Sequence, residues 1–304
     1  MNLGIARAAV FVLASAIAGR SADPPGFRAD SDFVFVGASV VDPQDHPVRG
    51  LTRADFRLFD DKVEQTIAYF GEQDVPLSLA VVFDTSGSMS GKLALMRRAL
   101  GALLAESYEQ DEFTLVRFAD RAAAAVPWTA DAGQIRSAVF SRPASGRTSL
   151  WDAVHAALAQ FQRAHNPRRA MVIFSDGGDN FSRYSQAQIS SELVEAGVQV
   201  YAIDTSEPPA AVNRNTDEMP VFNPLAAMCG RAGGRYYQLA GLREAQTVAQ
   251  RIGRELRAQY LLGFTPSREL RDGKLHNLKV RVKRPEGSPR LSVFWRRGYR
   301  APLF

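Results

Sequence analysis

Cysteine is almost absent from this sequence, which contains only Cys229 among its 304 residues. No intrachain disulfide can form, so a small disulfide-stapled scaffold is excluded. A cysteine-rich zinc site is excluded for the same reason. Histidine is scarce as well, and the spacing of the four histidines along the chain matches no metal-binding motif. These histidines are His46, His155, His165 and His276.

Neither sign of charge dominates. The chain has 37 Lys and Arg against 32 Asp and Glu, which leaves a net charge of only +5. This mild excess does not indicate nucleic acid as a partner. Hydrophobic residues make up 46% and charged residues 23%, as is typical of a soluble globular protein. Dominant disorder and fibrous rods are therefore excluded, and the length is compatible with one large domain or two smaller ones.

The chain also has no apolar run long enough to span a bilayer as a helix. The run from Ala8 to Ala18 follows Arg7 and ends in the small-x-small pattern Ala16-Ile17-Ala18. This order is typical of a secretory signal, although a buried N-terminal helix is the alternative interpretation. We expect residues 1–18 to be a signal peptide. The mature protein is then expected to be exported, to the periplasm or outside the cell, without a membrane span.

The middle of the chain, residues 75–255, alternates between two kinds of pattern. Nearly continuous apolar runs indicate parallel strands buried on both faces. Between them, apolar residues recur at helical spacing, for example from Leu93 to Leu104 and from Leu150 to Phe161. Such alternation predicts an α/β domain with a doubly wound, mostly parallel sheet. The apolar runs cover residues 77–83, 170–174 and 198–203.

The two flanks, residues 31–70 and 259–304, have the composition of β-structure. Leu278, Val280 and Val282 alternate with charged residues, which is the period of a half-exposed strand. Neither flank is long enough to bury a good core alone. We therefore predict that the flanks pair into one small β-sandwich, with the middle of the chain inserted into it.

Oxygen-bearing side chains follow the first buried strand. Asp84, Ser86 and Ser88 have i, i+2, i+4 spacing, and Gly87 allows the chain to curl between them. In an open α/β sheet the loops at the carboxyl ends of the strands build the ligand site. A helix N-cap is the alternative interpretation of this motif, because Ser and Asp are preferred there.

Two further loops are expected at the same edge of the sheet. Thr148 stands just before the second helical pattern, and Asp176 directly follows the strand at 170–174. Together with Asp84, Ser86 and Ser88 these side chains offer two carboxylates and three hydroxyls, which suit Mg²⁺, or Mn²⁺ or Ca²⁺. Two carboxylates only balance the charge of such an ion. An acidic group of a protein partner, an exposed Asp or Glu, is then the natural ligand for an open position.

Catalytic motifs give no support for an enzyme. Met89 stands where a G-x-S-x-G elbow would need its serine, and neither a Walker A lysine nor a G-x-G-x-x-G pattern is present. His155 has no accompanying nucleophile and orienting group. We therefore predict a binding module. A metal-assisted hydrolase using the same ion, and an envelope assembly or structural protein with a vestigial metal site, stay open as alternatives.

The segments DTSGSMS, GRTSLWDAV and FSDGGDN resemble the three loops of the von Willebrand factor A domain. This resemblance covers about residues 75–255 and implies a doubly wound fold with a metal-ion-dependent adhesion site. It implies Ser86, Ser88 and Thr148 as hydroxyl ligands, with Asp84 and Asp176 acting directly or through water. The flanking segments VRGLTRADFRLFDD, YLLGFTP and RRGY resemble those of a bacterial VWFA-related family.

One departure from the family pattern concerns the rim of the expected site. Arg147 stands where many members carry Gly before the threonine, and it could crowd the rim or favour an acidic partner. Asp179 is expected near the same edge, where a turn or cap role is its alternative. Arg147 and Asp179 are therefore the candidate partner-binding rim.

Overall fold

The computed structural model describes residues 33–73, 75–140, 143–207, 223–266, 272–283 and 290–301. The predicted signal peptide, residues 1–18, lies outside the described residues. In the part of the chain that is described, no helix has both the length and the apolar character needed to cross a bilayer.

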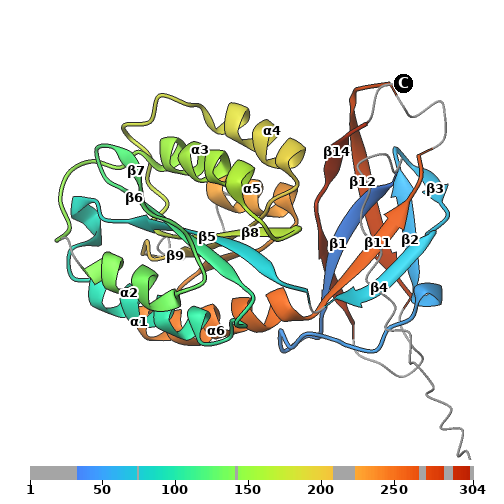
Figure 1. Cartoon of the computed structure of the whole chain (residues 1–304), viewed down its shortest axis with the longest axis horizontal. Coiled ribbons are helices and arrows are strands. Elements are labelled where there is room, and N and C mark those ends of the chain that lie inside the picture. The colour runs from blue at the N-terminus through green and yellow to red at the C-terminus, as the bar shows by residue number, and fades with distance from the viewer. Residues whose placement is uncertain are drawn as a thin grey trace, which may run out of the picture. The chain divides into compact units, whose positions relative to one another are not determined.

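A six-stranded sheet with the order β10-β9-β8-β5-β6-β7 forms the centre of the α/β part (Figure 1). All neighbouring strands are parallel except β6 and β7, which are antiparallel. The predicted doubly wound, mostly parallel sheet is thus confirmed. Its strands are β5 (Leu77–Asp84), β6 (Glu112–Phe118), β7 (Ala122–Thr129), β8 (Arg168–Ser175), β9 (Gln199–Asp204) and β10 (Tyr236–Gln238).

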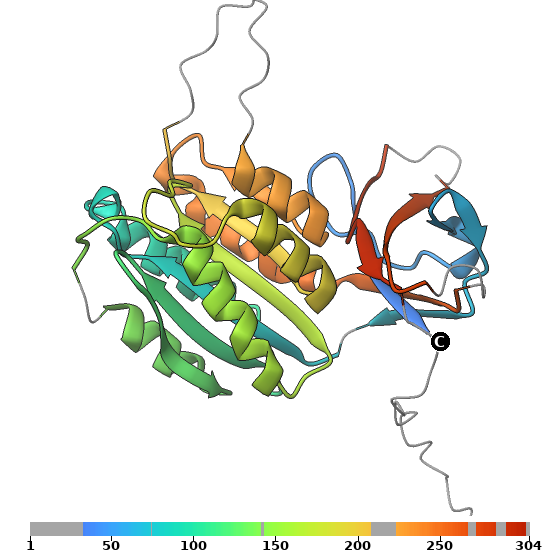
Figure 2. The ribbon, with the colours of Figure 1, turned by 90° about the horizontal axis from the view of Figure 1, so that it is seen from above.

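Helices cover both faces of this sheet, as Figure 1 shows. On one face lie α3 (Leu150–Gln160), α4 (Gln186–Ala196) and α5 (Pro224–Ala232), which Figure 2 shows side by side across the strands. The other face carries α1 (Leu93–Leu104), α2 (Ala132–Phe140) and α6 (Ala245–Arg257). Each face has its own hydrophobic core, and this double burial explains why the central strands are apolar without alternation.

Some elements of this part were not predicted. Strand β7, with the sequence AAAAVPWT, lies at the edge of the sheet and is largely exposed or half-buried. Its alanines show neither the apolar alternation nor the β-branched composition by which strands are recognised. Pro127 is tolerated there because an edge strand has one side without ladder hydrogen bonds.

The flanks form two antiparallel four-stranded sheets, β13-β1-β11-β4 and β14-β12-β2-β3. Side chains from both sheets, such as Val36, Tyr260, Leu58 and Leu278, share one hydrophobic core, which confirms the predicted sandwich. The domain boundaries themselves stay a prediction. The strands are β1 (Val34–Val41), β2 (Phe56–Asp60), β3 (Val63–Gln65), β4 (Tyr69–Gln73), β11 (Gln259–Phe264), β12 (Leu275–Val282), β13 (Ser292–Trp295) and β14 (Gly298–Arg300).

Short 3-10 turns complete the secondary structure, and one of them shows how local sequence sets local structure. Thr52 precedes such a turn, and its backbone N–H donates to Asp55 Oδ2 at 2.7 Å, as a capping box requires. The turns are η1 (Arg53–Asp55), η2 (Gly87–Met89), η3 (Phe161–Arg163) and η4 (Leu242–Glu244).

A buried ion pair fastens the end of α6 to Asp111, the residue that precedes β6. The guanidinium of Arg257 donates to both oxygens of Asp111, and only 7% and 0% of the two side chains are exposed. Asp111 also accepts the backbone N–H groups of Leu77 and Tyr108, at 2.9 and 2.7 Å. Removing one partner of such a pair leaves the other charge buried without compensation.

We expect Asp111→Ala to lower the free energy of unfolding by about 3–5 kcal/mol. The change leaves the buried charge of Arg257 and two backbone N–H groups without their partner. Urea unfolding measures this loss. Arg254→Ala is the control, since Arg254 forms a largely exposed pair with Glu106 and should cost about 1 kcal/mol or less. Equal losses for the two variants would contradict a special role for the buried pair.

Candidate metal centre

The register of the parallel strands brings acidic and hydroxyl groups to one edge of the sheet. Asp84, Ser175 and Asp204 are the last residues of β5, β8 and β9. Phe83 pairs with Phe174, and Ser175 pairs with Asp204, so the three strands end at the same level. The loops that follow these strands therefore begin next to one another.

Asp84 is fully buried, and both of its carboxylate oxygens are held in place. Oδ1 accepts the backbone N–H of Ser86 at 2.8 Å, and Oδ2 accepts the hydroxyl of Ser175 at 2.7 Å. Burial raises the pKa of the Asp84 carboxyl, and the negative charge of Asp176 raises it further. A cation bound beside the two carboxylates would relieve both of these unfavourable effects.

The two serines of the first loop lie side by side. The hydroxyl oxygens of Ser86 and Ser88 are 3.1 Å apart, within the loop that includes η2. Met89, which follows, is fully buried and anchors the loop to the core. The backbone N–H of Gly87 donates to the carbonyl of Gly146 at 3.0 Å, which ties the first loop to the second.

Thr148 lies in the second loop and is 5% exposed. Its backbone N–H donates to Asn180 Oδ1 at 3.0 Å, and the backbone N–H groups of Asn180 and Phe181 donate to its carbonyl. These bonds join the second loop to the third, which carries Asp176. The structure therefore brings the three loops named from the sequence together. Direct bonds link Asp84 with Ser86 and Ser86 with Ser88, whereas Thr148 is held through its backbone.

Lys92 is a neighbour of the site that the sequence analysis missed. Its ammonium lies 3.7 Å from Asp176 Oδ2, and the two side chains are 23% and 12% exposed. Lys92 immediately precedes α1, so the first loop positions it. Ser175 and Asn180, which orient Asp84 and Thr148, were also missed. Their only sequence signal is adjacency, since they belong to the segment that contains Asp176.

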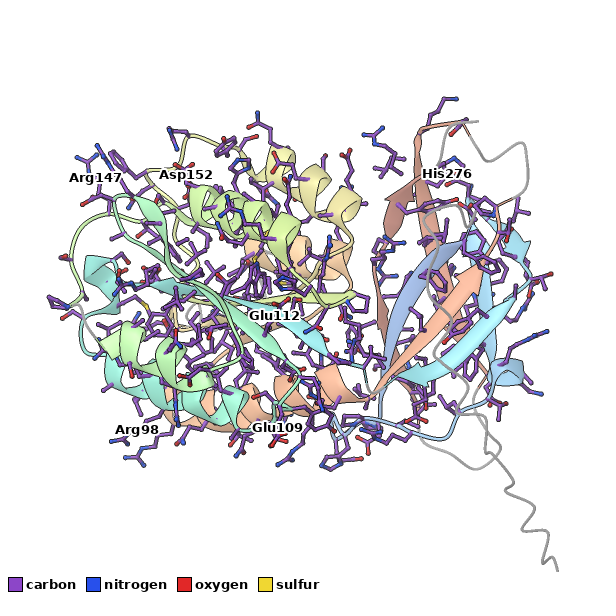
Figure 3. All side chains as sticks on the ribbon, in the orientation of Figure 1. Arg98, Glu109, Glu112, Arg147, Asp152 and His276 are labelled. Carbon is purple, nitrogen blue, oxygen red and sulfur yellow. The ribbon has the colours of Figure 1, made fainter. Side chains whose placement is uncertain are left out.

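The two candidate rim residues have different surroundings. Arg147 is exposed (Figure 3). Its guanidinium lies 4.6 Å from the centre of the Phe181 ring. The carboxylate of Asp179 accepts the backbone N–H of Leu150 at 2.9 Å and the hydroxyl of Ser182 at 2.5 Å. Asp179 therefore makes the contacts of a helix cap, which is the role named above as the alternative to partner binding. Its contact with a partner stays a prediction.

The donor set fits a hard divalent cation. It consists of oxygens only, from two electrostatically coupled carboxylates and three hydroxyls, and Mg²⁺ prefers such ligands. The set is supplied by Asp84, Ser86, Ser88, Thr148 and Asp176.

This geometry defines an α/β domain whose loops gather oxygen-bearing side chains at the carboxyl edge of a parallel sheet. Residues 79–178 match the family described as von Willebrand factor type A domain. The chain thus contains a von Willebrand factor type A domain, as the resemblance of its loops implied. No curated protein matches the chain in sequence.

Several solved structures are similar to parts of this chain. A von Willebrand factor type A protein from Catenulispora acidiphila is 12% identical and aligns over 91% of this chain and 75% of its own, with a TM-score of 0.51. The conserved hypothetical protein BatB from Bacteroides thetaiotaomicron is 18% identical over 60% of this chain and 100% of its own, with a TM-score of 0.48. A D319A mutant of the PilB minor pilin from Streptococcus sanguinis is 14% identical over 61% and 62%, with a TM-score of 0.48. At 12% identity the similarity to the Catenulispora acidiphila structure concerns the fold alone.

We expect Asp84→Asn to leave the unfolding temperature in chelator unchanged or raised, because the neutral amide avoids burying a charge beside Asp176. The same variant should lose any rise in unfolding temperature on addition of Mg²⁺. Asp179→Ala is the contrasting variant. It should lose about 0.5–2 kcal/mol of stability with its cap and keep the response to Mg²⁺. Thermal melts in EDTA and in Mg²⁺ measure both effects, and a full Mg²⁺ response in Asp84→Asn would count against the site.

Proposed function

We propose that this protein is an exported, divalent-cation-dependent protein-binding module of the adhesion type. Mg²⁺, or Mn²⁺ or Ca²⁺ in its place, would be held by Asp84, Ser86, Ser88, Thr148 and Asp176. The observation that supports this most directly is the bonding of three separate loops around two coupled carboxylates and a pair of hydroxyls. When bound, the ion supplies a positive centre for a carboxylate of the partner.

The charges around the site favour an acidic partner. Two carboxylates balance a divalent ion, and Lys92 then adds a positive charge 3.7 Å from Asp176. Arg147 adds a second one at the rim, where its guanidinium is stacked on Phe181 and exposed. The ion, Lys92 and Arg147 attract an exposed Asp or Glu, and the carboxylates of Asp120 and Asp179 beside the second loop oppose that attraction in part.

A hydrolase would need a general base beside the ion. Within the described ranges, no histidine hydrogen-bonds to a proposed ligand, and His155 instead bonds to Glu192 at 2.8 Å and stacks on Tyr184. These contacts argue against His155 as the general base of a metal-assisted hydrolase. Turnover of a generic ester or phosphate that vanished with Asp176→Ala would favour the hydrolase instead. An assembly or structural role with a vestigial metal site is the remaining alternative.

The proposal is tested by binding to an array of short peptides in which each Asp- or Glu-containing sequence is paired with its Asn or Gln counterpart. We expect capture of acidic peptides in Mg²⁺, loss of capture in EDTA, and loss in Asp84→Ala. A basic-to-neutral change at the rim, Arg147→Gln, should weaken capture without changing the response to Mg²⁺ alone. Coincident melts of the wild type with and without Mg²⁺ would overturn the proposal, and capture that survives chelation would favour the assembly role.

Lys92 provides a separate prediction. Its ammonium stabilises Asp176 without the ion and opposes the ion when it binds. Lys92→Met should therefore bind Mg²⁺ roughly 1.4- to fivefold more tightly, given the 0.2–1 kcal/mol of a partly exposed pair. The same variant should capture acidic peptides more weakly. Calorimetric titration with Mg²⁺ measures the first effect. Arg98→Met, on the exposed side of α1, is the matched control and should change neither quantity.

A further inference from the structure

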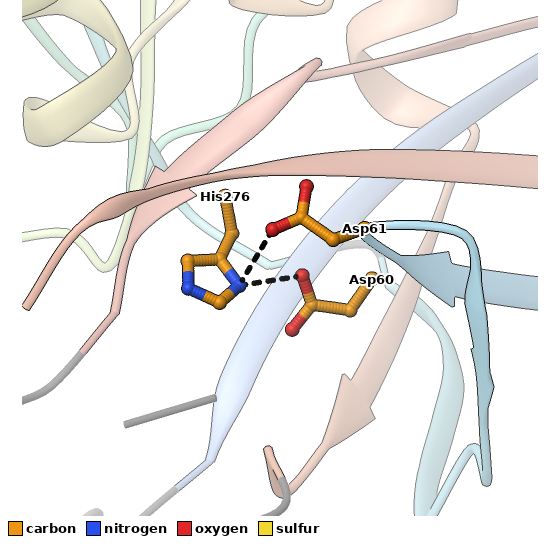
Figure 4. A group of neighbouring side chains, drawn as sticks. All are labelled: Asp60, Asp61 and His276. Carbon is orange, nitrogen blue, oxygen red and sulfur yellow. Dashed lines mark hydrogen bonds and ion pairs between the residues drawn. The ribbon is translucent and has the colours of Figure 1, made fainter. Parts of the chain in front are cut away.

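A second group of ligand-bearing side chains lies in the β-sandwich, outside the site described above. Asp60 ends β2, Asp61 begins the turn to β3, and His276 lies on the neighbouring strand β12 (Figure 4). His276 Nδ1 is 3.1 Å from Asp60 Oδ1 and 3.2 Å from Asp61 Oδ2. The histidine spacing showed no metal motif because the partners come from opposite flanks of the chain.

The distances suit a single ion between the three side chains. One ligand atom from each residue lies within 4.8 Å of the others. Ligands bound tetrahedrally at 2.0–2.1 Å are separated by about 3.3 Å, close to both nitrogen–oxygen distances. A single N–H on Nδ1 cannot point straight at two oxygens of different residues, whereas an ion placed between them contacts all three.

The remaining polar atoms of the three side chains are held by other groups. His276 Nε2 is 3.0 Å from Asp272 Oδ1. The hydroxyl of Tyr299 donates to Asp60 Oδ2 at 2.7 Å, and the backbone N–H of Asn277 donates to Asp61 Oδ1 at 2.9 Å. A carboxylate on the far nitrogen of a histidine, and donors on the far oxygens of carboxylates, are the supports that metal ligands have.

Burial differs among the three ligands in a way that leaves an entry path. The side chains of Asp60 and His276 are 0% and 5% exposed, whereas that of Asp61 is 40% exposed. Asp61 therefore lies between the buried group and solvent, where water could complete the coordination. Nitrogen is a ligand that Zn²⁺ and its neighbours accept readily, whereas Mg²⁺ prefers oxygen only.

The competing interpretation is a protonated histidine that serves as the cation itself. Burial works to lower the pKa of His276, but the hydrogen bond to Asp272 and the charge of Asp60 outweigh it and raise that pKa. An imidazolium is thus stable here when no metal is present. A transition-metal ion at Nδ1 must replace its proton, so the two interpretations predict opposite responses to added metal.

We propose that Asp60, Asp61 and His276 bind one divalent transition-metal ion of the Zn²⁺ class. The ion would link the β2–β3 turn of the N-terminal flank to β12 of the C-terminal flank. Asp272 would be a positioning residue, since it holds the His276 ring through Nε2. This site is independent of the proposed adhesion site in both place and ligand chemistry.

The experiment uses the full chain carrying Asp176→Ala, so that the oxygen site does not contribute. We expect Zn²⁺ to bind with a stoichiometry of one and to raise the unfolding temperature, while Mg²⁺ does neither. Co²⁺ should give the visible absorption of a nitrogen- and oxygen-ligated tetrahedral ion. No bound Zn²⁺ and no shift in the melt would overturn the proposal and leave the imidazolium interpretation.

Substitutions that preserve the turn locate the ion. Asp61→Asn keeps an oxygen for the Asn277 N–H and should weaken Zn²⁺ binding at least tenfold. Asp272→Asn should weaken it about ten- to a hundredfold, as loss of a supporting group does. Glu64→Gln is the control, since this exposed carboxylate on β3 pairs with Arg57 instead. Binding that is equally tight in all three variants would place the ion elsewhere and refute the site.

Discussion

The burial of one carboxylate, Asp84, is the constraint on which the candidate adhesion site depends. The parallel register of β5 and β8 places it next to Ser175, whose hydroxyl donates to it at 2.7 Å. A buried carboxylate is costly unless it is hydrogen-bonded and its charge is balanced. Here both oxygens are bonded, yet the charge of a second carboxylate, Asp176, raises the pKa of Asp84 further. The sheet therefore holds a charge that favours a cation from solution.

Burial also determines how the two flanks are arranged, here through the apolar faces of their sheets. A sheet with one apolar face must bury it, and neither flank carries enough strands to do so alone. Pairing of β1 with β11 and of β2 with β12 joins the two flanks into one core. Along the chain, the α/β part therefore lies between β4 and β11, as an insertion between strands of the sandwich. The same pairing brings Asp60 and Asp61 against His276, so the second ligand group is a consequence of how the sandwich closes.

How far the sequence could predict this structure depends on whether the signal was local. Runs such as Leu77–Phe83 predicted buried strands because burial on both faces removes polar residues from the run itself. The proposed ligands Asp84, Ser86 and Ser88 form one short motif, and the sequence predicts them as a group. Lys92 could not be assigned from the sequence, since its role rests on the 3.7 Å that separates it from Asp176 after folding. His276 was dismissed on spacing, because its partners Asp60 and Asp61 lie about two hundred residues away along the chain.

The two proposed cation sites differ in how easily a bound ion could exchange one of its ligands. Oxygen ligands at the exposed edge of a sheet leave a hard ion able to exchange water for a partner's carboxylate. A histidine supported by Asp272, with Asp60 buried and bonded to Tyr299, has little freedom to reorganise around a ligand. A site of that kind stabilises a fold more readily than it exchanges a partner. Nitrogen discriminates against Mg²⁺, whereas an all-oxygen set also accepts Zn²⁺, so the ligands alone keep Mg²⁺ out of the second site and metal availability decides which ion fills the first.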